Sequence, residues 1–443
     1  CTGFGQAVKD ISMKGIFMEK SLKKDIIINR LPVVIYFILI FAALMVIISA
    51  VAPVSNHEPK TTDTYSDFST GWLNCEESEA SLDHLSGTTV IHRTITAADC
   101  NKTLFFFAKT SNIKVFIDGV CQYKNKHFCS QFFGKTPGAL FVNVLIPAES
   151  DGKLLEIEIE NPYKDDDSAK LDEMYIGDIS DIIQFQQQKR FHPFCLSFII
   201  MVLGVVMLLL FIPPTRQKMV GIEFVNLGVT AFVAGLYLTT DGRYLQLVFG
   251  DAHIYHVIAE TAMRLATPLF LIFLSQMYDS YSKRISTILC VIGEIAFVVC
   301  FIDEITGIMD YHETLFLVHV VFVISMLFIL VSTIKGIVKA PKENIYHNIG
   351  CIVFSFMAMT DVIVLWRGTG RETSYFIRLG ILIFFFMEIV QIMKKFLASY
   401  QRNIKNELLS RLAYHDGLTD LLNRTSYIEK VKELEDDETP YML

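Results

Sequence analysis

Ionisable side chains inside long apolar stretches are the first candidates for chemistry in this chain of 443 residues. Charges within membrane segments are costly to bury, so those that persist often bind ligands, transfer protons or relay signals. Glu260 and Arg264 lie four residues apart, which places them on one face of a helix where they can also pair with each other. The residues that we predict to couple signals inside the membrane are Glu260, Arg264, Glu294, His319 and Asp361.

The same residues have structural interpretations, which the sequence leaves open. Glu260 and Arg264 can simply stabilise their helix, and His319 alone can be a hydrogen-bonded interior histidine. Arg378 lies near the start of the last apolar stretch, where a long side chain can reach the membrane surface. Coupling and packing roles are therefore both consistent with the sequence.

The composition is typical of a protein that is partly embedded in a membrane: 52% of the residues are hydrophobic, 12% are aromatic and only 19% are charged. Soluble domains carry about 25% charged residues, so a wholly soluble enzyme is excluded. A disordered scaffold is excluded by the apolar content. The net charge of −8 provides no basic field, which argues against nucleic acid as a partner. The nine cysteines include no C-x-x-C pair, so the sequence indicates no metal site.

Long apolar runs predict the membrane helices. The first, at 31–53, follows a cytoplasmic N-terminal segment at 1–30, and its length favours an uncleaved signal anchor over a signal peptide. The other runs predict a seven-helix bundle over 194–393, without the internal repeat typical of many transporters. These runs cover 194–213, 221–240, 253–277, 285–302, 314–334, 346–366 and 375–393.

Residues 54–190 are polar and rich in short β patterns, which predicts a β-sandwich of jelly-roll type. Asp118-Gly119 is typical of a hairpin turn. The aromatic run at 105–107 could stack on a sugar, although such residues in a strand are more typical of a core. The predicted strands lie at 88–91, 103–107, 113–117, 139–144 and 154–159.

Four cysteines fall within this β region. In an exported domain they could form two disulfides, with three possible pairings, and free thiols are an equal alternative. The cysteines concerned are Cys75, Cys100, Cys121 and Cys129.

Basic residues mark one side of the predicted bundle. Lysines and arginines follow its first, third, fifth and seventh runs, whereas the connection at 303–313 contains neither. Because basic loops stay in the cytoplasm, the β region is predicted to lie outside and the C-terminus inside. The protein is therefore predicted to be a multi-pass protein of the cytoplasmic membrane.

The last apolar run continues into a polar helix over 394–415. An apolar stripe on this helix favours a parallel two-helix seam, and hence a homodimer, although packing against the chain's own C-terminal domain is also possible. The stripe consists of Leu397, Tyr400, Ile404, Leu408 and Leu412.

The segment after this helix, at 416–443, carries a motif. Asp416-Gly417 favours a sharp turn, and Asn423 can cap the following helix. The stretch resembles the opening of a GGDEF domain, the catalytic domain of diguanylate cyclases, whose pattern is D-x-L-T-G-L-x-N-R. Asp420 departs from the pattern, where the family commonly has Gly. The matching positions, which this resemblance assigns to structure, are Asp416, Leu418, Thr419, Leu421, Asn423 and Arg424.

The resemblance implies the first helix of an α/β domain that we expect to continue beyond Leu443. Diguanylate cyclases work as dimers that join two GTP molecules into cyclic di-GMP with the help of Mg²⁺. The family's metal-binding carboxylates fall beyond this chain, so no catalytic residue is assigned here. The order of β domain, seven helices and output also resembles the bacterial seven-transmembrane receptors with diverse intracellular signalling modules, which implies a bacterial inner membrane.

The sequence thus predicts a sensory receptor that couples an external small molecule, with a carbohydrate among the candidates, to a diguanylate cyclase. The alternative is a receptor whose degenerate GGDEF domain only binds nucleotide or a partner. His415-Asp416 could also suggest a histidine kinase, but no proline follows Thr419 as that motif requires. A transporter is disfavoured by the large exported domain.

Overall fold

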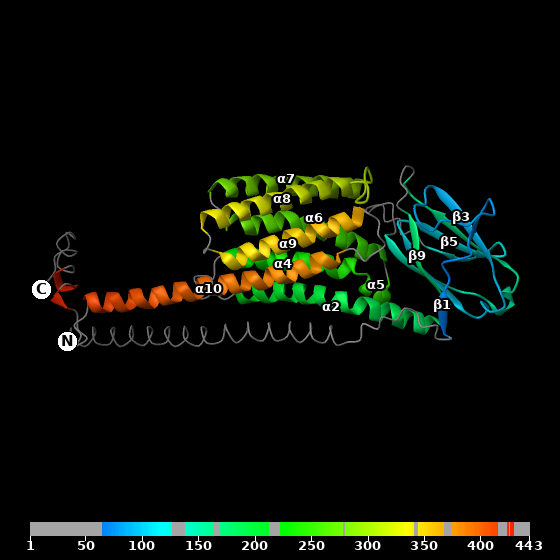
Figure 1. Cartoon of the computed structure of the whole chain (residues 1–443), viewed down its shortest axis with the longest axis horizontal. Coiled ribbons are helices and arrows are strands. Elements are labelled where there is room, and N and C mark those ends of the chain that lie inside the picture. The colour runs from blue at the N-terminus through cyan, green and yellow to red at the C-terminus, as the bar shows by residue number, and fades with distance from the viewer. Residues whose placement is uncertain are drawn as a thin grey trace, which may run out of the picture.

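The computed structural model describes residues 64–125, 138–163, 169–211, 222–250, 252–277, 280–340, 344–366, 374–414, 423–424 and 426–428. The predicted anchor at 31–53, Cys129 and most of the GGDEF-like segment lie outside the described residues. Figure 1 shows a β domain at one end of a bundle of long helices, with the last helix extending beyond the other end.

The β domain is a sandwich of two antiparallel sheets within the described residues. Sheet A has the strand order β1-β9-β4-β7, and sheet B has the order β2-β3-β8-β5-β6. A short 3-10 helix, Ala148–Ser150, precedes β8. The strands are β1 (Tyr65–Asp67), β2 (Leu73–Asn74), β3 (Thr88–Thr94), β4 (Thr103–Lys109), β5 (Asn112–Ile117), β6 (Val120–Lys124), β7 (Ala139–Leu145), β8 (Leu154–Glu160) and β9 (Lys170–Gly177).

The five strands predicted from sequence are confirmed as β3, β4, β5, β7 and β8. The predicted hairpin is also present, since Asp118 and Gly119 have positive φ and Ile117 pairs with Val120. Strand β9 was not predicted, although it lies inside sheet A. Its register against β4 shifts, and Glu173 has a φ of 54°, so its buried residues do not alternate regularly.

Sheet A is covered on both faces, which is why β4 is almost continuously buried. Phe106 belongs to the core between the two sheets. Phe105 and Phe107 point to the opposite face, where Phe105 stacks on Phe141 and Arg243 of the bundle lies over the Phe107 ring. These strand aromatics therefore pack the domain and join it to the bundle, and they do not form an open surface for a sugar.

The helical part confirms the prediction of seven membrane-length helices, counted within the described residues. One further short helix, α5, connects two of the long ones. The helices are α2 (Ile179–Phe211), α4 (Ile222–Asp241), α5 (Tyr244–Phe249), α6 (Ala252–Ser275), α7 (Ser280–Thr306), α8 (Leu315–Lys339), α9 (Ile345–Trp366) and α10 (Tyr375–Tyr414).

Two of these helices are longer than the apolar runs within them. Helix α2 begins at Ile179, directly after β9, so its first turns belong to the β domain's side of the molecule. Helix α10 is continuous over 40 residues and leaves the bundle at the end opposite the β domain, as Figure 1 shows. A single continuous helix therefore runs from the end of the bundle near the β domain to beyond its opposite end.

Helices α2 and α4 are in contact through their backbones. A Cβ atom added at Gly235 would lie 2.4 Å from the backbone nitrogen of Met201, and one at Gly204 would lie 2.4 Å from that of Phe232. Small residues allow such close packing of membrane helices, where van der Waals contact replaces the hydrophobic effect. We call this contact the α2–α4 seam.

Candidate functional site

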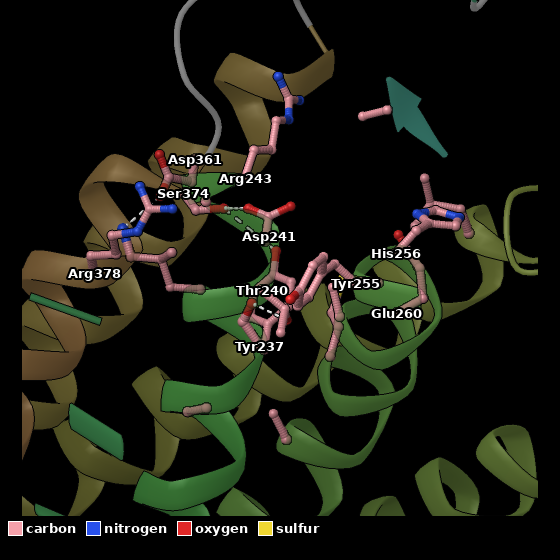
Figure 2. A pocket seen from close by; sticks show the side chains of 18 of the residues that line it. Tyr237, Thr240, Asp241, Arg243, Tyr255, His256, Glu260, Asp361, Ser374 and Arg378 are labelled. Carbon is pink, nitrogen blue, oxygen red and sulfur yellow. Dashed lines mark hydrogen bonds between the residues drawn. The ribbon is translucent and has the colours of Figure 1, made fainter. Parts of the chain in front are cut away.

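A cavity of about 670 Å³ lies where the β domain meets the bundle. Strands of sheet A line one side, and α4, α6, α8, α9 and α10 line the others. Figure 2 shows polar side chains gathered in its upper part, whereas Phe270, Phe354 and Phe384 make part of its lining apolar. Small-molecule sites typically have volumes of about 300–1,000 Å³ and combine apolar walls with a few polar groups. The cavity fits that description.

Arg378 brings a buried guanidinium with one unsatisfied nitrogen to this cavity. It lies in the first turn of α10 and is only 3% exposed, so it does not extend to the membrane surface. Its Nε donates to Ser197 Oγ at 3.1 Å, whereas the buried Nη1 has no hydrogen-bond partner. Among the described residues, no carboxylate forms an ion pair with Arg378. Because a buried donor without a partner is costly, this nitrogen is complementary to an anion.

Acidic residues hold the start of α10 against the cavity. Asp361 accepts the backbone N–H of Ile377 at 2.5 Å and that of Phe376 at 3.3 Å. Asp241 accepts a hydrogen bond from the Ser374 hydroxyl at 3.0 Å. Carboxylates near a helix N-terminus are stabilised by its unpaired N–H groups. The end of α10 at the cavity is therefore fixed by groups from both α4 and α9.

The predicted pair of Glu260 and Arg264 is present, with a separation of 2.6 Å between Arg264 Nη1 and Glu260 Oε2. Arg264 also donates to the Tyr311 carbonyl at 2.7 Å and lies over the Tyr311 ring. Glu260 lines the cavity. The pair thus connects the cavity wall on α6 to the loop between α7 and α8.

The other predicted coupling residues divide between the cavity and the bundle exterior. His319 on α8 lines the cavity together with Glu260 and Asp361. Glu294 lies on the exposed side of α7, where it accepts a hydrogen bond from Cys290 Sγ at 3.5 Å. The structure therefore gathers three of the predicted residues, together with Arg378, around one space and leaves Glu294 apart from them.

Polar contacts line the cavity on the side of the β domain. Glu173 of β9 forms ion pairs with Arg190 and Lys189 of α2, at 2.7 and 2.8 Å. Burial alone would raise the pKa of Glu173, but the charges of Arg190 and Lys189 outweigh it and lower the pKa to about 2. The carboxylate is therefore charged at neutral pH and ties β9 to α2.

A second polar contact joins the β domain to the loop between α7 and α8. The Tyr163 hydroxyl donates to Asp310, and the Tyr163 ring stacks on His312 with 4.5 Å between ring centroids. Burial and the Asp310 carboxylate raise the pKa of Tyr163 well above its ordinary value of 10. The domain junction, as we use the term, consists of the Glu173 ion pairs, the Tyr163 contacts and the Arg243–Phe107 contact.

Sequence reasoning missed the groups that come from the β domain and the first turns of α2. Glu173, Lys189 and Arg190 lie outside the apolar runs, so a search for charges within those runs could not find them. The only local signal is the polar stretch before the first apolar run. Its position over sheet A becomes evident only from the fold.

The cysteines of the β domain are free thiols among the described residues. Cys75, Cys100 and Cys121 each donate to a backbone carbonyl, of Val90, Thr96 and Tyr123 respectively. Cys129 lies outside the described residues, so its pairing stays a prediction.

The GGDEF-like segment touches the end of α10 in the part that is described. Asn423 Oδ1 accepts the backbone N–H of Ser426 at 3.1 Å, the contact expected of a helix N-cap. Asn423 Nδ2 also donates to the Ala413 carbonyl at 2.7 Å, and the Asn423 backbone N–H donates to Tyr414. Arg424 is helical, and the motif positions Asp416, Leu418, Thr419 and Leu421 lie outside the described residues.

No protein family, curated protein or solved structure matches the chain. The functional argument therefore depends on the geometry of the site and on the GGDEF-like motif.

Proposed function

We propose that this protein is a membrane receptor in which a small molecule occupies the cavity at the domain junction and α10 transmits its presence to a cytoplasmic output domain. One observation carries the proposal: α10 is a single helix that begins at the cavity and ends at the GGDEF-like segment. Because α10 is continuous in hydrogen-bonded helix, a change in how its first turn is seated can reach its far end.

The ligand class follows from the charges in the cavity. A carboxylate on the ligand would pair with Arg378, whose fork of N–H donors matches two carboxylate oxygens. Asp241 and Glu260 also line the cavity and would repel a doubly charged phosphate. We therefore propose a small molecule with a single carboxylate, of which an acidic sugar is one example.

The proposed coupling runs through the first turn of α10. An anion on Arg378 would compete with the contacts that Asp361 and Ser374 make there, and so would change how α10 is seated. Leu397 and Ile404, where α10 leaves the bundle, are each 48% exposed in the single chain. Their exposure supports a homodimer in which two such helices pair.

The proposed output is synthesis of cyclic di-GMP by the full-length parent. In this proposal the β domain lies outside the bacterial inner membrane, and the C-terminus lies in the cytoplasm with GTP and Mg²⁺. Two cyclase domains would then meet or separate as the α10 helices change their pairing, so that proximity controls turnover. No residue of the present chain takes part in that chemistry.

The coding sequence after Leu443 is the first test of the output. A GG-D/E-EF turn, followed by cyclic di-GMP formation from GTP and Mg²⁺ by the longer protein, would support an enzyme. A turn without its acidic residue would support the alternative, a receptor with a degenerate domain that only binds nucleotide or a partner. A reporter fused after Arg424 tests orientation, and a periplasmic reporter would exclude both.

Ligand binding has its own test on the present chain. We expect gluconate, a singly charged sugar acid, to raise the unfolding temperature of the detergent-solubilised protein, and neutral glucose to have no effect. Arg378→Gln should abolish the gluconate effect, whereas Lys335→Gln, which removes an exposed charge on α8, should retain it. Equal stabilisation by both sugars, or an unchanged response in Arg378→Gln, would contradict the carboxylate proposal.

A further inference from the structure

Three metal-ligating side chains meet between α9 and α10, at the end of the bundle away from the β domain. His347 and Cys351 lie one turn apart on α9, and Glu388 lies opposite them on α10. All three are buried, with exposed fractions of 3% or less. Their candidate ligand atoms lie within 4.8 Å of one another. None of the three lines the cavity at the domain junction, so this is a separate site.

The spacing of the three groups is close to that of a tetrahedral zinc site. Zinc bonds of about 2.0 Å to nitrogen and oxygen and 2.3 Å to sulfur place neighbouring ligand atoms about 3.3–3.6 Å apart. Cys351 Sγ lies 3.6 Å from His347 Nε2 and 4.0 Å from Nδ1. His347 Nδ1 and Glu388 Oε1 are 2.5 Å apart, joined by the hydrogen bond that a metal would replace. That pair has to open, and the three ligand atoms, which lie within 4.8 Å of one another, have to converge on one ion.

The second carboxylate oxygen of Glu388 points to a missing partner. Glu388 has an exposed fraction of 0%, and its buried Oε2 has no hydrogen-bond partner. A buried carboxylate oxygen without a partner is costly, more so in a bundle surrounded by lipid. A cation bound between α9 and α10 would satisfy it.

The charges also balance with a divalent metal. A thiolate from Cys351, a carboxylate from Glu388 and a neutral imidazole from His347 sum to two negative charges, which Zn²⁺ cancels. Thiolate and imidazole are ligands that select zinc over magnesium or calcium. A neutral complex is the form that a low-dielectric interior accepts most readily.

We propose that His347, Cys351 and Glu388 form a binding site for Zn²⁺ that clamps α9 to α10. Binding forms one bond each from the metal to sulfur, nitrogen and oxygen, and releases the Cys351 thiol proton together with any proton on the bound imidazole nitrogen. A water molecule would complete four ligands. The site does not depend on the proposed ligand at the domain junction, although a bound metal would restrict the movement of α10.

The test uses the whole chain, purified in detergent without a polyhistidine tag and stripped with a chelator. Titration with Co²⁺, a spectroscopic substitute for Zn²⁺, should give one equivalent of binding per chain. We expect the intense visible bands of tetrahedral cobalt and a thiolate-to-cobalt band in the near ultraviolet. Added Zn²⁺ should displace the cobalt and bleach both signals.

Two variants separate this site from unrelated metal binding. Cys351→Ser should abolish the thiolate band, whereas Cys300→Ser, which removes another buried thiol on α7, should leave it unchanged. Glu388→Gln keeps the shape of the side chain and should weaken cobalt binding at least about tenfold, as loss of supporting ligand contacts does elsewhere. Helical ellipticity reports whether each variant is folded. Absence of cobalt binding by the parent chain, or a thiolate band that survives Cys351→Ser, would overturn the proposal.

Discussion

The α2–α4 seam and the domain junction hold the molecule together by different means. At the seam, Gly204 and Gly235 bring two helix backbones into contact and leave no room even for a methyl group. At the junction, the partners are Glu173 with Arg190, Tyr163 with Asp310, and Arg243 over Phe107, grouped around a cavity. One contact is apolar and close-packed, whereas the other is polar and partly hollow.

This difference indicates which contact can change with a signal. Close-packed apolar surfaces have one arrangement, and moving them loses contact energy at once. Polar contacts around a cavity can be exchanged for contacts to a ligand or to water at a lower net cost. We therefore expect the seam to be the fixed part of the bundle and the junction to be its adjustable part.

The largest effect is expected at the seam. Gly235→Ala places a methyl group 2.4 Å from the Met201 backbone nitrogen, so α2 and α4 must separate. We expect a loss of about 2–4 kcal/mol in the free energy of unfolding, the upper range for overpacked sites. The loss is measured from the fall of helical ellipticity as SDS is titrated into mixed micelles.

A glycine without neighbours provides the matched control. A Cβ at Gly336 on α8 would meet nothing within 4 Å. Gly336→Ala should therefore be neutral, or should stabilise the protein by up to about 1 kcal/mol through helix propensity. If both alanine variants unfold at the same SDS fraction, the backbone contact at the seam is not what holds α2 to α4.

A smaller, pH-dependent effect is expected at the junction from Glu173→Gln. The pKa of Glu173 is about 2 in the folded protein and 4.5 ordinarily, because Arg190 and Lys189 outweigh the effect of burial. Because the folded-state pKa is lowered, the Glu173 carboxylate stabilises the folded protein fully above pH 4.5. This stabilisation is lost as the pH falls through about 2. We expect the variant to lose about 2–3 kcal/mol at neutral pH, a cost that reflects the uncompensated charge of buried Arg190.

The measurement is the difference between the unfolding free energies of parent and variant from pH 7 down to pH 2. The difference should be constant to about pH 4.5 and then shrink. Glu158→Gln is the control, because Glu158 pairs with Lys114 at 2.6 Å in a more exposed position on sheet B. Its cost should be under about 1 kcal/mol. A difference that does not vary with pH would mean that the Glu173 charge does not stabilise the junction.

The sequence predicted the parts of this comparison that depend on local pattern. Long apolar runs identified the seven helices, a four-residue spacing identified the Glu260–Arg264 pair, and Asp118-Gly119 identified the hairpin. Each of these depends on residues close together in the chain. The Asn423 cap also follows from neighbours within three residues.

What could not be predicted depends on contacts between distant segments. The role of Arg378 is set by Ser197 on α2, far away in sequence, and by the absence of a nearby ion pair among the described residues. Strand β9 was hidden because its irregular register removes the alternation that marks a strand. The close group of His347, Cys351 and Glu388 likewise forms only when two helices pack together. It contains no C-x-x-C pair, the pattern that would indicate a metal site from sequence alone.

The smallest effect is expected from Tyr163→Phe. The variant loses the hydroxyl that donates to Asp310 but keeps the ring that stacks on His312. Asp310 would still accept the backbone N–H groups of His312 and Glu313, each at 3.1 Å. Because the carboxylate stays partly satisfied, we expect a loss of only about 1 kcal/mol in the free energy of unfolding at neutral pH.

The pH dependence of this variant tests whether burial and Asp310 hold the phenol in its neutral form. Burial and Asp310 raise the folded-state pKa of Tyr163 above 10, so the phenol stabilises the protein below pH 10 and this contribution is lost as the pH rises further. The difference in unfolding free energy between the parent and Tyr163→Phe should therefore become smaller above pH 10. Tyr123→Phe is the control, because only burial raises the pKa of Tyr123; its cost at neutral pH should be smaller. A difference that stays constant above pH 10 would mean that burial and Asp310 do not hold the phenol neutral, and the junction would then resemble the seam more closely than its polar contacts indicate.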